Sequence, residues 1–147
     1  MAIKSVGGIR VSDWRKLTVE KGMIESRFPC FRCKAVLADT TKLECFGFIR
    51  PTEHSITYSL KLDYQVWKTP RVYVVEPEIV PTAQIHIYQE GNLCLFYPKE
   101  TPWTPVLHIC DTILPWTAEW LVYYELFKIT GQWLGKSALH DSSAKTE

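Results

Sequence analysis

The chain lacks a long hydrophobic run, a hydrophobic leader and an excess of charge. No apolar stretch approaches the roughly 18 residues that a membrane-spanning helix needs, and residues 1–8 lack the apolar core of a signal peptide. Lys and Arg total 17 against 16 Asp and Glu, a formal net charge of +1. A near-neutral chain has no electrostatic footprint for nucleic acid or an anionic membrane. We therefore expect a cytoplasmic protein with no membrane or nucleic-acid partner.

Several common catalytic motifs are absent as well. The sequence has no Gly-x-Gly-x-x-Gly, no phosphate-binding Gly-Lys-Ser/Thr, no Gly-x-Ser-x-Gly and no His-Glu-x-x-His. Dinucleotide-binding, nucleotide-binding, serine-hydrolase and zinc-protease functions therefore lose their usual support. We expect no metal and no organic cofactor, and any consumption of ATP would fall to a partner protein.

The composition is that of a globular protein, with 147 residues of which 46% are hydrophobic and 13% aromatic. This length suits one domain with a real core. The sequence shows no internal repeat and no linker, so we expect a single domain over residues 1–136. Residues 137–147 are rich in Ser, Ala and Lys and predict a loose C-terminal tail.

Hydrophobic spacing predicts two helices with strands between them. Val11–Ser26 has an imperfect apolar stripe, whereas Pro115–Thr130 carries aromatic residues at helical spacing and is followed by Gly131, a typical helix stop. The four predicted strands are Cys30–Leu37, Leu43–Ile49, Ser55–Leu62 and Arg71–Glu76. Short turns between consecutive strands indicate an antiparallel meander. This segregation of elements predicts an α+β fold.

The five cysteines, an odd number in a chain without an export signal, favour free thiols. Cys30-Phe31-Arg32-Cys33, with Cys45 and His54, admits a zinc site, but the spacing is incomplete as a zinc pattern. Strand residues three apart point to opposite faces, so Cys30 and Cys33 would not converge on one ion. We therefore favour thiols packed within the strands over a metal site. The remaining cysteines are Cys94 and Cys110.

A long segment with little periodicity, residues 80–105, separates the last predicted strand from the last helix, and such a segment is usually functional. Within it, Gly91-Asn92-Leu93-Cys94-Leu95 and Trp103-Thr104-Pro105 resemble the active-site region of ubiquitin-conjugating enzymes. Tyr58–Tyr64 and Thr69–Val72 resemble the third and fourth strands of that family. The resemblance covers most of the chain, roughly from residue 10 to residue 131.

Residues 91–98 and 115–121 resemble more narrowly the bacterial branch of this family, which occurs in operons for antiphage defence. These operons include the cyclic-oligonucleotide (CBASS) systems, and the chain resembles their stand-alone, short type II form. The resemblance implies the ubiquitin-conjugating (UBC-like) fold, with an N-terminal helix, a four-stranded meander, an active-site loop and a C-terminal helix. It also implies partners: a cGAS-like nucleotidyltransferase or a ubiquitin-like protein, each presenting its C-terminal tail. It admits a separate activating enzyme as a further partner.

The resemblance also assigns roles to residues of the loop. Cys94 would accept a protein C-terminus as a thioester, which keeps enough free energy to acylate an amine. His86 stands where the family has an asparagine; its imidazole could stabilise the oxyanion, orient the loop or act as a base. No cation lies beside Cys94 in the sequence, so we do not expect a strongly depressed thiol pKa. The residues expected to shape the loop are Gly91, Asn92, Trp103 and Pro105.

Three alternatives remain open. Cys94 could be a buried, inert cysteine in a UBC-fold protein that only binds a partner. Cys94 and His86 could instead act as a thiol hydrolase that releases the acyl group to water. The chain could also be the conjugating enzyme of a bacterial ubiquitination-like pathway.

Overall fold

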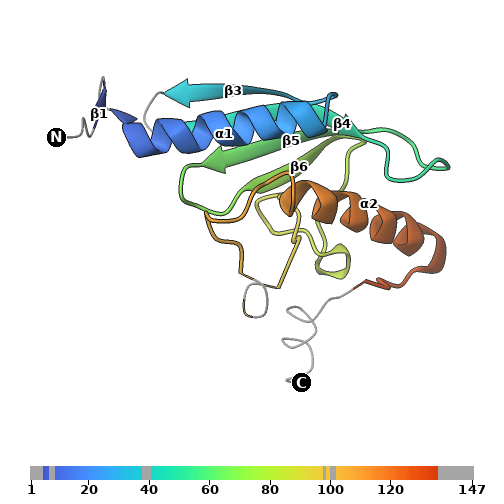
Figure 1. The fold of residues 1–147 in the computed structure, drawn as a ribbon. Helices are drawn as coiled ribbons and strands as arrows, with labels where there is room; N and C mark the ends of the chain where they lie inside the picture. Colours follow the sequence, from blue (N-terminus) through green and yellow to red (C-terminus); the bar gives the residue numbers. More distant parts are fainter. Residues whose placement is uncertain (1–4, 7–8, 38–40, 98, 100–101, 136–147) are drawn as a thin grey trace.

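The computed structural model describes residues 5–6, 9–37, 41–97, 99 and 102–135 (Figure 1). These residues form two helices and a four-stranded antiparallel sheet, which confirms the predicted α+β class. The long elements are α1 (Val11–Arg27), β3 (Arg32–Leu37), β4 (Thr41–Ile49), β5 (Tyr58–Gln65), β6 (Arg71–Glu76) and α2 (Ile113–Thr130). The short elements are strands β1 (Ser5–Val6) and β2 (Ile9–Arg10) and the 3₁₀ turn η1 (Ala83–Ile85).

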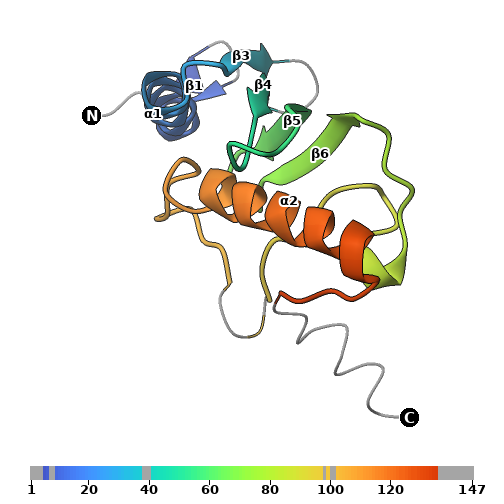
Figure 2. The same ribbon diagram turned by 90° about the vertical axis from the view of Figure 1, so that its right-hand side faces the viewer.

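The strands pair as consecutive neighbours in the order β3-β4-β5-β6, the predicted meander. Helix α1 packs along β3 and β4, whereas α2 runs beneath β5 and β6 (Figures 1 and 2). Alternate residues of β4 and β5 are buried on one face of the sheet, and buried side chains of both helices join them in one core. The largest fully buried side chains of these four elements are Leu17, Ile24, Leu43, Tyr58, Leu60, Leu62, Tyr64, Ile113, Leu114 and Leu121.

Several boundaries differ from the sequence prediction by one to three residues, and two of these differences have a local reason. The third predicted strand begins at Tyr58 rather than at Ser55. The Arg50 guanidinium donates to the carbonyl oxygen of Ser55 at 3.1 Å and holds the preceding residues in a loop. Helix α2 begins at Ile113, before Pro115. Proline is tolerated there because the first N–H groups of a helix have no helical acceptor.

The N-terminal hairpin of β1 and β2 does not follow from hydrophobic spacing. Its sequence clue is the Gly7-Gly8 pair between the two strands, which is typical of a two-residue hairpin turn. The tail predicted over residues 137–147 lies outside the described residues. Within the described ranges, neither helix is long and apolar enough to cross a membrane.

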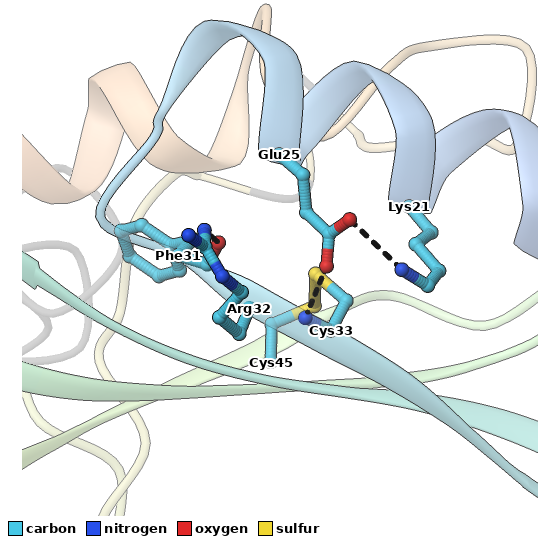
Figure 3. The surroundings of a disulfide bond; sticks show 6 residues. All are labelled: Lys21, Glu25, Phe31, Arg32, Cys33 and Cys45. Atoms are coloured by element: carbon cyan, nitrogen blue, oxygen red, sulfur yellow. Dashed lines mark hydrogen bonds and ion pairs between the residues drawn. A yellow bond between two sulfur atoms is a disulfide. The ribbon is translucent and has the colours of Figure 1, made fainter.

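The prediction of unpaired strand thiols is wrong for Cys33 and Cys45, which form a disulfide between β3 and β4 (Figure 3). The two residues are directly opposite in the antiparallel register, so their side chains leave the sheet on the same face. Glu25 of α1 accepts a hydrogen bond from the Cys33 N–H at 2.8 Å and pairs with Lys21, also at 2.8 Å (Figure 3). This bond ties α1 to β3. Cys30, which precedes β3, is exposed and outside the disulfide.

Gly47 on β4 leaves the space that the Phe31 ring occupies. A Cβ built at Gly47 would lie 2.3 Å from Phe31 Cγ, and Phe31 is fully buried. We expect Gly47→Ala to lower the free energy of unfolding by roughly 1–3 kcal/mol, the usual cost of overpacking a core. Gly22→Ala, at an exposed α1 position with nothing within 4 Å, is the matched control and should raise it by about 0.5–1 kcal/mol. Urea unfolding of both variants measures the difference, and a neutral Gly47→Ala would contradict the packing.

Candidate active site at Cys94

Residues 86–94 form a short hairpin beside the edge strand β6. Ile87 and Leu93 pair as an antiparallel bridge, and both are buried. The Leu93 N–H donates to the carbonyl oxygen of Val72 on β6 at 2.9 Å, which fixes the hairpin to the sheet. Gly91 closes the turn with a φ of 98°, and its N–H donates to the Tyr88 carbonyl oxygen at 2.8 Å. This left-handed conformation favours glycine and explains the residue type at position 91.

The hairpin register decides which side chains lie beside the cysteine. The Tyr88 N–H donates to the Asn92 carbonyl oxygen and the Cys94 N–H to the His86 carbonyl oxygen, both at 2.9 Å. These two hydrogen bonds flank the bridge pair. Because side chains alternate between faces, Tyr88, Asn92 and Cys94 share the face opposite the buried bridge residues.

The Cys94 thiol lies between a tyrosine hydroxyl and a backbone carbonyl. Its Sγ is 3.4 Å from the Tyr88 hydroxyl oxygen and 3.9 Å from the Phe96 carbonyl oxygen, to which the neutral thiol can donate. Burial raises the pKa of Cys94, and the hydrogen bond with Tyr88 lowers it in part. Burial also raises the pKa of Tyr88 well above its usual value, so its hydroxyl stays protonated and can donate to a thiolate.

The raised pKa of Cys94 predicts a pH-dependent thiol. Because the thiolate is the nucleophile, alkylation by iodoacetamide should rise about tenfold per pH unit from pH 7 until the pKa is passed. Tyr88→Phe removes the donor that favours the thiolate and should slow alkylation at pH 7.5 by about tenfold, since a hydrogen bond to a charged group contributes roughly 1.5–3 kcal/mol.

Tyr73→Phe is the matched control. Tyr73 is on β6, and its ring lies near the hairpin turn at Gly91, so this variant removes a tyrosine hydroxyl close to the same hairpin. The rates are measured in a Cys30→Ser background, with the modified site located by peptide mapping. A pH profile that Tyr88→Phe leaves unshifted would contradict the role given to Tyr88.

The structure places His86 next to Cys94 through its backbone. His86 is buried in a left-handed conformation, with φ 58° and ψ 51°. Its carbonyl oxygen accepts hydrogen bonds from the Cys94 N–H at 2.9 Å and from the Trp120 indole N–H at 3.2 Å. Its imidazole lies 5.0 Å from the Trp133 ring, centroid to centroid. These contacts tie the His86 backbone to both the hairpin and α2.

Trp103 and Pro105 hold the chain that follows the hairpin. The Trp103 indole N–H donates to the Thr112 hydroxyl at 3.0 Å, and its buried ring meets the Tyr64 ring edge-on at 5.7 Å. The Pro105 carbonyl oxygen accepts a hydrogen bond from Lys16 Nζ of α1 at 2.6 Å. The Trp-Thr-Pro sequence is therefore tied to both α1 and the start of α2.

A buried carboxylate on α1 strengthens this attachment. Glu20 is fully buried and accepts hydrogen bonds from Lys16 Nζ at 3.0 Å and from the Ile109 N–H at 2.9 Å. His108 Nδ1 lies 2.7 Å from the same carboxylate. The buried Glu20 carboxylate therefore has three polar partners, and these contacts anchor residues 105–109 against α1.

A cleft of about 580 Å³ lies between the β5–β6 turn and the hairpin, within the size range of ligand-binding clefts. Tyr88 and Phe96, which both contact the Cys94 thiol, line it, and so does Asn92. Cys94 itself is not among the described lining residues, and its sulfur reaches the cleft wall through these two contacts. Asn92 adds an amide at this wall, on the same face of the hairpin as Cys94.

The structure thus brings together Cys94, Asn92 and the turn at Gly91, with the His86 backbone behind them. Tyr88 is the site residue that sequence reasoning misses. Its clue is the register of a hairpin centred on Glu90, which places residue 88 diagonally across from residue 94 on the same face.

Two comparisons bear on the site. The family model E2-CBASS, described as type II CBASS E2 protein, matches residues 20–141 of the chain. This range contains the sheet, the hairpin with Cys94, the cleft and α2. No curated protein matches the chain.

Proposed function

The chain belongs to the family of type II CBASS E2 proteins, and on this basis we propose that it is a cysteine acyl transferase of antiphage defence. Membership of this family implies an E2-like role in CBASS defence. The proposal adds a UBC-like fold over residues 1–136, a C-terminal tail over residues 137–147, and catalysis by a thioester relay at Cys94. No membrane or nucleic-acid partner and no cofactor enters the proposed reaction.

The position of Cys94 carries the proposal. Its partly buried thiol lies on the face of the hairpin opposite the bridge pair, and Tyr88 and Phe96, which contact the thiol, line a cleft. A cysteine that served packing alone would need neither the cleft nor the tyrosine hydroxyl at 3.4 Å. This arrangement supports a reacting residue over an inert one.

The proposed reaction has two acyl transfers. The Cys94 thiolate attacks the activated C-terminal carbonyl of a donor protein, the activating group leaves, and a thioester forms on Sγ. An amine then attacks the thioester carbonyl, loses a proton and forms an amide, and the Cys94 thiolate is the leaving group. The Tyr88 hydroxyl would donate to the thiolate at the start and end of the cycle. The backbone contacts of His86, with Trp103 and Pro105, would keep the loop in place.

The donor is proposed to be a cGAS-like nucleotidyltransferase or a ubiquitin-like protein, presented by its C-terminal tail. Any ATP-dependent activation of that tail would fall to a separate partner, because the sequence contains no nucleotide-binding motif. Gene neighbours distinguish the donors. A nucleotidyltransferase alone favours the first, and an activating enzyme with a ubiquitin-like protein favours a ubiquitination-like pathway.

Phage challenge of cells that carry the whole operon tests the proposal. We expect Cys94→Ala to abolish protection and to remove any covalent conjugate of the donor. Cys30→Ala, at an exposed thiol outside the disulfide, is the matched control and should retain both. Full protection by the Cys94→Ala operon would refute catalysis and leave a binding module. Loss of donor tails to water without a conjugate would instead indicate a thiol hydrolase.

A further inference from the structure

The cleft beside Cys94 has a second wall at the β5–β6 turn. Lys68, Thr69 and Pro70 of this turn line it, together with Arg71 at the start of β6. The hairpin, fixed to β6 through Leu93, forms the facing wall. A ligand in the cleft would therefore lie between the turn and the hairpin that carries Cys94.

The charges of the cleft are unbalanced. Lys42 lies 3.4 Å from Asp63 Oδ1 and 3.4 Å from Glu44 Oε2, so its charge is already met by carboxylates. Lys68 and Arg71 are exposed, and neither forms an ion pair with any residue that the structure describes. Two cations at the turn are thus available to a ligand, whereas Asp63, the acidic side chain among the described residues of the lining, pairs with Lys42.

The rest of the lining is suited to a peptide. Leu95, Phe96 and Trp103 supply apolar surface, and Asn92 and Tyr88 supply hydrogen-bonding groups near the sulfur. A mixed surface with two cations at one end favours an extended peptide with carboxylate side chains, since Lys and Arg recognise carboxylates by charge-assisted hydrogen bonds. A purely apolar or a cationic segment would leave these charges unmet.

We propose that this cleft selects the donor by its tail: the last residues of the donor protein lie in it as an acidic segment whose terminal carbonyl reaches Cys94. This inference rests on the proposed thioester relay. Lys68 and Arg71 are specificity-determining residues in this account and do not touch the reacting atoms. The consequence is that donors with acidic C-terminal segments are accepted in preference to those with basic ones.

Synthetic peptide thioesters test the inference without an activating enzyme. Two peptides end in the same glycine thioester and differ only in three preceding residues, which are Asp in one and Lys in the other. The Cys94 thiolate attacks the peptide carbonyl, forms a thioester on Sγ and releases the small thiolate. Intact mass in a Cys30→Ser background gives the rate, and iodoacetamide alkylation measures intrinsic reactivity of Cys94 in every variant.

We expect the acidic peptide to acylate Cys94 about tenfold faster at low salt, an advantage that shrinks in high salt because exposed charges are screened. Lys68→Glu with Arg71→Glu should invert the preference. Arg15→Glu with Lys34→Glu changes the same net charge at exposed positions outside the cleft and should retain it.

If the acidic and the basic peptide acylate the wild-type protein at equal rates, or if the basic peptide reacts faster, the inference is overturned and the proposed function stays intact. Stronger inhibition by a single-stranded oligonucleotide than by the free acidic peptide would also overturn it and assign the cations to nucleic acid. If neither peptide acylates a Cys94 that iodoacetamide still modifies, the proposed relay itself fails, and the inference fails with it.

Discussion

Replacing Cys94 with alanine should lower the rate of acyl transfer by at least about 10³-fold, the scale seen when the nucleophile of a covalent mechanism is removed. Cys94→Ser should give a different result. A serine oxygen would hold the acyl group as an ester, which reducing thiol does not remove, whereas the wild-type thioester is cleaved by it. The measurement is intact mass of each variant after incubation with donor and activating partner, before and after addition of thiol.

The other two cysteines outside the disulfide, Cys30 and Cys110, bear on the controls for this prediction. Cys30 is exposed and Cys110 is buried, and neither lies on the hairpin. Cys30→Ser should therefore form a thiol-labile adduct at the wild-type rate. An undiminished rate in Cys94→Ala would show that another group accepts the acyl chain and would contradict the account.

Glu20→Ala is expected to lower the free energy of unfolding by about 3–5 kcal/mol, because removing one partner of a buried ion pair leaves the other charge uncompensated. Lys16 would lose its carboxylate while its side chain stays only 10% exposed. The Ile109 N–H would lose its acceptor, and residues 105–109 would lose their anchor to α1. Urea unfolding measures the loss of free energy, provided that the m-value is the same in the variant and the wild type.

Glu119→Ala is the matched control, because Glu119 is an exposed glutamate inside α2. It should change the free energy of unfolding by less than about 0.5 kcal/mol. The double variant Lys16→Met/Glu20→Leu should recover part of the stability, since apolar residues of similar volume can replace a buried pair. A Glu20→Ala protein as stable as the control would show that the buried carboxylate does not anchor the loop.

Local sequence was sufficient for the elements with a clear period. The strand Arg71–Glu76 was predicted with its observed bounds, and α2 ends at Gly131 as expected, with φ 76° at that glycine. The disulfide was not predictable in the same way. It depends on the register that sets Cys33 opposite Cys45, and nothing in the residues around either cysteine fixes that register.

The site shows the same division between local and distant information. Cys94 is marked by its own neighbours in the sequence, and Gly91 by the turn that it closes. The role of Tyr88 depends on a hairpin pairing, and the burial of Glu20 depends on His108, which is 88 residues further along the chain. The sequence of α1 alone gives no reason to expect that Glu20 is buried. Contacts of this kind follow only from the folded arrangement.

The central claim is that Cys94 carries a donor protein as a thioester. The most direct test is the intact mass of the protein after co-expression with its genomic neighbours, measured with and without reducing thiol. The account predicts an added mass equal to a whole donor protein less one water, located on Cys94, removed by thiol and absent in Cys94→Ala. No added mass, together with a partner complex that Cys94→Ala leaves unchanged, would contradict it.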